Sequence, residues 1–253
     1  MSSRRIALFS VAGLIVLWAC QIGLAKGHVL IYTKNGKGYV HDNIPASVEC
    51  LKGICTANGW TYEVSDNAGI FTQEKIKGFD VLVFSNTNNE TFDSNDQRQV
   101  FQDYIRGGGG FVGIHSACGS ERAWPWFWAN LGGKFVRHPP LQPFDIKVID
   151  SSHPSTRFLG PVWKWEDECY YLNQLNPDIH VLLAVDLTTV KDDQKKVYPG
   201  EVFGQYFPLS WYHEFEGGRQ WYTALGHQIA HYQDENFKKH LAAGITWAMR
   251  KDK

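Results

Sequence analysis

The stretches that decide the fold are DVLVFS (80–85), SNDQRQVFQDYI (94–105) and GGGGFVGIH (107–115). The first and the last are short apolar runs, which are typical of strands buried on both faces. Between them, Ser94 and Gln97 have the spacing of a capping box, and the residues that follow place apolar side chains on one helical face. A strand–helix–strand order predicts two parallel strands joined by a right-handed crossover.

The same alternation extends along the rest of the chain. A strand over 28–33, a helix that begins at Pro45 with Asp42 or Asn43 as its N-cap, and a strand over 61–65 precede the central stretches. Later segments read as further strands (144–150, 181–185, 209–215 and 221–225) and as an amphipathic helix (234–250). We find no linker, repeat or low-complexity segment, so we expect one α/β domain over residues 26–253.

The composition excludes several classes of protein. The chain has 253 residues, of which 43% are hydrophobic and 20% charged, as in an ordinary globular domain. With 25 basic and 26 acidic residues, no basic excess supports an extended nucleic-acid surface. Aromatic residues make up 14% of the chain and leave rings available for a ligand site.

The N-terminus has the pattern of a targeting segment. Arg4 and Arg5 precede an uncharged run over 6–25, which ends in a small-x-small cleavage pattern over 23–25. We interpret residues 1–25 as a cleaved secretory signal, with a lipobox at 17–20 and an uncleaved anchor as alternatives. Each of these interpretations exports the domain, and we expect stable membrane contact only if the segment is retained.

Removal of residues 1–25 leaves four cysteines, which are Cys50, Cys55, Cys118 and Cys169. Export permits disulfides, and four cysteines allow three pairings. Because no C-x-x-C motif is present, we favour buried free thiols.

His115 is the most informative residue. Ligands of open α/β sheets bind outside the carboxyl ends of the strands, so the segments 33–41, 85–93 and 115–128 are expected to form one pocket. The stretch Gly113-Ile-His-Ser-Ala117 resembles a nucleophile elbow with histidine in the nucleophile position. An imidazole there can be an acid, a base or a metal ligand, or a core histidine bonded to a backbone carbonyl. Both interpretations stay open at this point.

Further histidines and acidic residues follow predicted strands. We expect His115 and His213 to form the catalytic centre, or to bind a divalent metal (Zn or Mn) if one is present, with His41 and His227 in support. The carboxylates that could complete such a set are Asp167, Glu168 and Glu214. Asp167 could orient an imidazole.

The aromatic stretch 124–128 follows His115 closely. Its rings Trp124 and Trp126 would suit stacking against a sugar, whereas the alternative is that they pack the following helix onto the sheet. We place both, with Asn86, Tyr170 and Glu214, among the expected substrate-binding residues. Gly107 to Gly110 precede a strand, so they indicate a helix stop and not a phosphate-binding loop.

Taken together, these stretches resemble the trehalose-utilisation (ThuA-like) family. The matching segments cover about residues 28–249, and they are HDNIP (41–45), DVLVFSNT (80–87), GGGGFVGIHSA (107–117), HP (153–154), DE (167–168) with Tyr170, WYHE (211–214) and YTALGH (222–227). The resemblance implies a class I glutamine-amidotransferase-like fold, that is, a flavodoxin-like three-layer sandwich with a mainly parallel central sheet. His115 occupies the position of the amidotransferase cysteine, so glutamine hydrolysis is not implied.

The resemblance links the chain to disaccharide use through 3-keto-glycosides. One hypothesis is an enzyme that acts on oxidised sugars as a hydrolase, lyase or isomerase. The other is a non-catalytic sugar-binding protein on the same fold. In both, the partner is a small carbohydrate, and a homodimer is left open.

Overall fold

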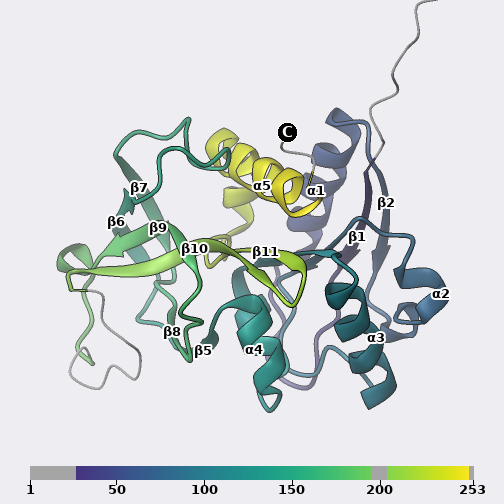
Figure 1. The fold of residues 1–253 in the computed structure, drawn as a ribbon. Helices are drawn as coiled ribbons and strands as arrows, with labels where there is room; N and C mark the ends of the chain where they lie inside the picture. Colours follow the sequence, from purple (N-terminus) through teal and green to yellow (C-terminus); the bar gives the residue numbers. More distant parts are fainter. Residues whose placement is uncertain (1–26, 195–203, 251–253) are drawn as a thin grey trace, which may run out of the picture.

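The chain folds around one long, curved sheet (Figure 1). The computed structural model describes residues 27–194 and 204–250. The nine strands of this sheet follow the order β2-β1-β3-β4-β11-β10-β9-β6-β7. Their bounds are β1 His28–Tyr32, β2 Thr61–Ser65, β3 Val81–Ser85, β4 Gly110–Ile114, β6 Gln142–Val148, β7 Val162–Asp167, β9 His180–Asp186, β10 Tyr206–Phe215 and β11 Gly218–Thr223. A small antiparallel pair, β5 Lys134–Arg137 and β8 Tyr171–Asn173, lies below it.

The sheet is mixed, with a parallel half and an antiparallel half. Strands β2, β1, β3, β4 and β11 pair in parallel. Beyond β11, every pairing is antiparallel, so β10 and β6 run against the other strands while β9 and β7 run with them. Most strands therefore point in one direction, and their carboxyl ends share one edge of the sheet.

Helices cover both faces, which gives three layers (Figure 1). The helices α1 and α5 lie on one face and α3 and α4 on the other, while α2 lies beside α3. Their bounds are α1 Ile44–Ala57, α2 Gln73–Ile76, α3 Asn95–Arg106, α4 Pro125–Leu131 and α5 Glu235–Ala248. The α/β fold expected from the sequence is confirmed. None of the helices in the described ranges is both long and apolar enough to cross a membrane.

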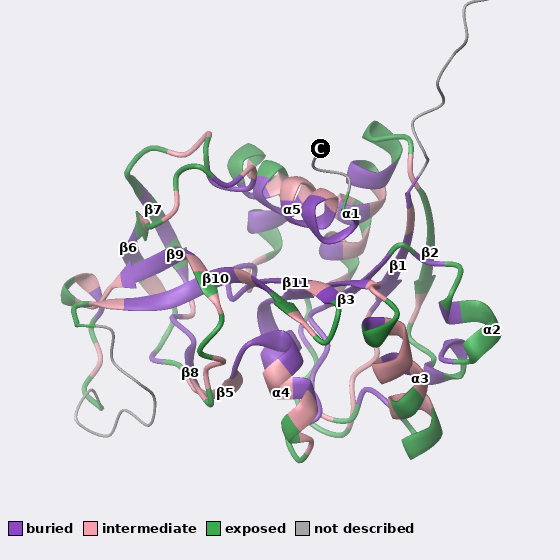
Figure 2. Cartoon of the chain, in the orientation of Figure 1, coloured by how far each residue is buried: buried purple, intermediate pink, exposed green. Residues whose placement is uncertain are grey.

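Strands β3 and β4 are buried throughout, as their unbroken apolar runs predict, whereas the edge strand β2 is exposed (Figure 2). The glycine run ends α3 as expected, because Gly107 follows its last residue and Gly108 has a φ of +90°. Gly110 permits the close approach of α5, since a Cβ there would lie 2.5 Å from the carbonyl oxygen of Ala248. Strand β7 was not predicted from the sequence, although its residues alternate between exposed and buried from Val162 to Asp167.

The cysteines are unpaired in the described part of the chain, and Cys55, Cys118 and Cys169 are buried. The favoured interpretation of free thiols agrees with this arrangement.

The expected signal segment, residues 1–25, lies outside the described residues.

The buried His240 of α5 makes stability depend on pH. Its Nδ1–H donates to the carbonyl oxygen of Ser155 at 2.8 Å, and burial lowers the pKa of its imidazole to about 4. Above pH ~6.5 the ring is neutral in both the folded and the unfolded state. Between pH ~6.5 and ~4 the unfolded chain binds a proton that the folded chain does not, so stability falls as the pH falls.

We therefore expect wild type to lose about 2–3 kcal/mol more unfolding free energy than His240→Gln between pH 7 and pH 4.5. Urea unfolding at the two pH values measures this difference. The control His180→Gln, at an exposed residue of β9, should behave like wild type. Equal losses in wild type and His240→Gln would contradict the assignment.

Candidate functional site

The site begins at His115, the first residue after β4. His115 is fully buried, and its backbone has a φ of +51°, in the left-handed region that non-glycine residues rarely adopt. Gly113 makes room for this bend, because a Cβ there would lie 3.0 Å from the Tyr222 ring and 3.3 Å from the Ala117 Cβ. The backbone therefore turns sharply between strand and helix, as the elbow pattern in the sequence predicts.

The hydrogen bonds of His115 fix its tautomer. Its Nδ1 lies 2.8 Å from the carbonyl oxygen of Ala224, which can only accept, so Nδ1 carries the proton. Its Nε2 then accepts a hydrogen bond from the Tyr170 hydroxyl at 2.9 Å. Burial, together with the neighbouring His41, lowers the pKa of His115 well below its ordinary value. The site therefore contains a neutral imidazole whose lone pair faces a pocket.

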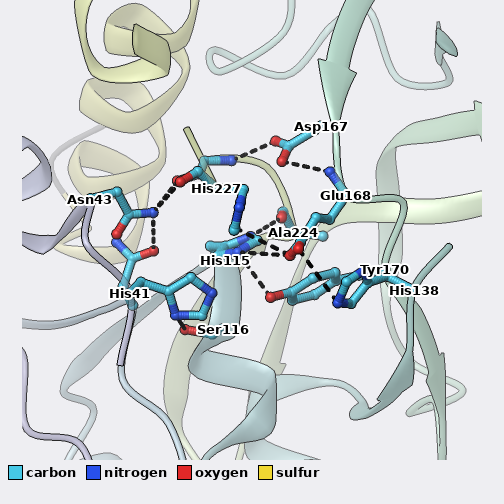
Figure 3. A network of polar contacts seen from close by, with 12 residues as sticks. His41, Asn43, His115, Ser116, His138, Asp167, Glu168, Tyr170, Ala224 and His227 are labelled. Atoms are coloured by element: carbon cyan, nitrogen blue, oxygen red, sulfur yellow. Dashed lines mark hydrogen bonds and ion pairs between the residues drawn. The ribbon is translucent and has the colours of Figure 1, made fainter. Parts of the chain in front are cut away.

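Two further imidazoles lie against this ring (Figure 3). His41, from the loop between β1 and α1, and His227, from the loop after β11, have ring centroids 4.8 and 5.4 Å from that of His115. The Nδ1 of His41 lies 3.2 Å from the Ser116 Oγ. Burial, with His227 nearby, lowers the pKa of His41 to about 4. This ring is also a neutral donor and acceptor.

Glu168 completes the group from the end of β7. Its Oε2 lies 3.7 Å from the Nε2 of His115 and 3.2 Å from the Nδ1 of His227. Its Oε1 lies 3.5 Å from the Nε2 of His138, a ring that follows β5. Burial raises the pKa of Glu168. The ligand atoms of His41, His115, Glu168 and His227 all lie within 4.8 Å of one another.

Asp167 and Asn43 hold the two loops that carry Glu168 and His227 (Figure 3). The Asp167 carboxylate accepts from the backbone N–H groups of Glu168 and Gly226, at 2.8 and 2.9 Å. The Asn43 Nδ2 donates to the carbonyl oxygens of Gly226 and His227, both at 2.7 Å. Asn43 directly precedes α1 but makes no side-chain cap, because its amide is used in this network.

His41, Glu168 and His227 line a pocket of about 400 Å³, and the fully buried His115 lies behind them. The aromatic rings around it are Tyr39, Phe135 and Tyr170, and Tyr39 is 61% exposed. The guanidinium of Arg122 lies 5.4 Å from the centre of the Phe135 ring. The remaining lining residues are Asn88, Ser116, Gly119 and His138. The pocket combines a polar centre with aromatic walls.

His213 lies away from this pocket. Its position does not agree with the expectation that His213 and His115 together form the catalytic centre or bind a metal. Strand β10 is antiparallel to its neighbours, and His213 pairs with Gln220 near the start of β11. The carboxyl end of β10 therefore lies at the opposite edge of the sheet. His213 is buried there, with its Nε2 bonded to the carbonyl oxygen of Asn130 at 2.9 Å. Glu214 lies at the same edge and pairs with Arg219.

The other expected substrate-binding residues, apart from Tyr170, also lie elsewhere. Trp124 stacks on Trp126 at 5.2 Å, and Trp126 packs against Phe101 of α3. This is the packing alternative of the sequence analysis. Asn86 is fully buried and donates to the Tyr232 hydroxyl at 2.9 Å, so it supports the loops below the pocket. Asp167 contacts no imidazole of the pocket; its nearby ring is His231, at 3.4 Å.

Several residues of the pocket were not predicted from the sequence. Phe135 and His138 lie on or directly after β5, outside the segments that the strand-end rule selects. Tyr39, Ser116 and Arg122 lie within the selected segments 33–41 and 115–128, but their side chains were not named as expected pocket groups.

A model of the ThuA family, described as trehalose utilisation, matches residues 28–248. A search of curated protein sequences gave no match. Among solved structures, a ThuA-like protein from Bacteroides uniformis superposes with a TM-score of 0.72 at 24% identity, over 90% of this chain and 93% of the other. A ThuA-like protein from Parabacteroides merdae gives 0.69 at 20% identity, over 88% and 90%.

A more distant likeness is to a β-galactosidase from Rahnella sp. R3, with a TM-score of 0.57 at 14% identity. It covers 90% of this chain but 32% of the enzyme, so it shows the fold alone. The family model, in contrast, spans nearly the whole described chain. The protein therefore belongs to the ThuA, or trehalose-utilisation, family and has its glutamine-amidotransferase-like fold.

Proposed function

We propose that this protein is an exported enzyme that acts on an oxidised sugar, a 3-keto-glycoside derived from a disaccharide. The observation that carries the proposal is the convergence of His41, His115, His227 and Glu168, from four separate segments, in one cluster at the wall of a pocket. Clusters of buried titratable groups in a concave site are typical of catalytic centres. The family's description as trehalose utilisation supports a sugar as the substrate.

The pocket suits a sugar ring in size and lining. Its volume of about 400 Å³ falls in the range of small-molecule sites. Tyr39 stands exposed at its rim, where an aromatic face can stack on the C–H face of a sugar. In our proposal this ring takes the role that the sequence analysis gave to Trp124 and Trp126.

The chemistry of a keto sugar fits the polar centre. A ketone at C3 acidifies the adjacent C–H bond, so a base can take that proton while the electron pair forms the enolate and its negative oxygen. His138 is placed for this step, because its Nδ1–H donates to the carbonyl oxygen of Pro139 and leaves the lone pair of the neutral ring on Nε2. Glu168, 3.5 Å away, can stabilise the proton that His138 gains.

The enolate oxygen needs a partner of opposite charge or a hydrogen-bond donor. The Tyr170 hydroxyl, which donates to the Nε2 of His115 in this structure, lines the pocket and is the donor that can turn to the enolate oxygen, in a buried centre where such contacts are strong. Expulsion of the glycosidic oxygen from the enolate would give the lyase outcome, and later addition of water to the resulting unsaturated ketone would give the hydrolase outcome. Reprotonation at another carbon, without loss of the glycosidic oxygen, would give the isomerase outcome. The proton abstraction is common to all three.

The central test compares two buried histidines. His115→Ala should lose at least ~100-fold in turnover of a 3-keto-disaccharide, because it removes the ring around which the other groups are arranged. His213→Gln, at the opposite edge of the sheet, should keep turnover within about 3-fold. Product formation by the purified variants, checked for folding by circular dichroism, measures both effects.

Turnover that survives His115→Ala would show that His115 is not the centre of the reaction. If wild type binds the sugar but never turns it over, and His115→Ala binds it equally well, the protein is a sugar-binding protein without catalysis.

The Tyr39 ring should act mainly in binding. Tyr39→Ala is expected to raise KM about 5-fold with little change in kcat, because a stacking contact is worth ~1 kcal/mol. Trp124→Ala is the matched control and should leave KM unchanged, since its ring packs on Trp126. The reverse pattern in steady-state kinetics would move the sugar to the Trp124 side.

Export rests on the pattern of residues 1–25. N-terminal sequencing of the mature protein from its native cells should begin at Lys26. Acylated Cys20, or an intact chain in the membrane fraction, would select one of the other export routes. An intact chain in the cytosol would contradict export.

A further inference from the structure

We propose that the floor of the pocket is a metal site, in which His41, His115, His227 and Glu168 bind one divalent transition-metal ion. The role of the ion in turnover rests on the proposed function, whereas its binding does not. In the described part of the chain, this is the one group of three or more His, Cys, Asp or Glu side chains whose ligand atoms converge.

The spacing of the ligand atoms matches a single ion. Zinc lies about 2.0–2.2 Å from histidine nitrogens and carboxylate oxygens, so two of its ligands lie at most ~4.4 Å apart. The four ligand atoms already lie within 4.8 Å of one another, and the Oε2 of Glu168 is 3.2 and 3.7 Å from the nitrogens of His227 and His115. Around a tetrahedral ion two such ligand atoms lie about 3.4 Å apart. The two contacts of Glu168 already fit this spacing, and the widest pair closes by about 1 Å or more when an ion binds.

The surroundings prepare the ligands for a metal. A metal-binding histidine usually donates its other ring N–H to a carbonyl or carboxylate, which fixes the tautomer. His115 does this, because its Nδ1–H donates to the carbonyl oxygen of Ala224 and leaves Nε2 as the ligand atom. The Ser116 hydroxyl lies 3.2 Å from the Nδ1 of His41 in the same way. Figure 3 shows the side chains of His41, His227 and Glu168 gathered around the His115 ring.

The charge balance also points to a cation. The ion-pair contacts of Glu168 within the described residues are all to histidines: His115, His138 and His227. Neither Lys nor Arg shares in these contacts. In addition, the Nδ1 of His227 is buried without a hydrogen-bond partner, although it lies 3.2 Å from the Glu168 Oε2. A carboxylate surrounded by imidazoles, one of which has a ring nitrogen without a hydrogen-bond partner, is an arrangement that a divalent cation completes.

The donor set of three imidazole nitrogens and one carboxylate oxygen suits zinc or a neighbouring first-row ion. Such a site uses the Oε2 of Glu168 and leaves Oε1 facing His138. The ion would lie beside the Tyr170 hydroxyl, where it could polarise the keto oxygen of the substrate. It would thus stabilise the enolate while His138 exchanges the proton.

The test titrates metal without any sugar. Protein purified without a polyhistidine tag and stripped with chelator should bind one equivalent of Zn²⁺ by calorimetry. Co²⁺ bound in its place should give the visible absorption of an ion with imidazole ligands. Glu168→Gln and His227→Ala should each weaken Zn²⁺ binding by at least ~100-fold, because loss of an outer-shell partner alone costs 10–100-fold.

Two control variants define the site. His180→Ala removes an exposed histidine of β9, and His213→Gln removes a buried histidine at the opposite edge of the sheet. Both should bind Zn²⁺ within about 5-fold of wild type. No stoichiometric binding by folded wild type, or an equal loss in the ligand and control variants, would overturn the metal site. Tight binding without turnover of any keto sugar would instead uphold the site and reject the proposed function.

Discussion

The whole site depends on one contact, between the Nδ1–H of His115 and the carbonyl oxygen of Ala224. Strands β4 and β11 pair in parallel with Ile114 opposite Thr223, so His115 and Ala224 are the next residues on each side. The ladder therefore sets the ring beside the carbonyl. The Tyr222 hydroxyl, which donates to the His115 carbonyl oxygen at 2.9 Å, holds the backbone in the same position.

To make this contact, the backbone of His115 must adopt an unfavourable left-handed conformation. A left-handed non-glycine residue costs roughly 1–3 kcal/mol and persists where the surroundings determine it fully. Here two buried strands, the bond to Ala224 and the bond from Tyr222 do so. A site built on rigid strands keeps its geometry better than one built on loops. The loops of His227 and Glu168 gain comparable rigidity from Asn43 and Asp167.

Much of the fold and part of the site could be predicted from the sequence. Buried parallel strands leave unbroken apolar runs, and the strand-end rule then selected His41, His115 and His227 correctly as neighbours. The rule failed for His213 because it assumes parallel strands, whereas β10 is reversed by its hairpin with β11. The local signal for that reversal is the tight turn Glu216-Gly217, in which both residues have positive φ as a β-hairpin turn requires. Phe135 and His138 were missed because a short strand and the loop after it meet the pocket through tertiary contacts alone.

The elbow geometry also limits which chemistry the site can perform. In a nucleophile elbow, the exposed side chain attacks the substrate; His115 is instead fully buried and offers a lone pair at Nε2. Burial and the neighbouring His41 lower the pKa of this ring, which therefore remains neutral. Ser116, the nearest hydroxyl, bonds to His41 and sits one residue past the elbow. The bend therefore presents an acceptor for a proton or a cation, and it is unsuited to the covalent step of a glutaminase.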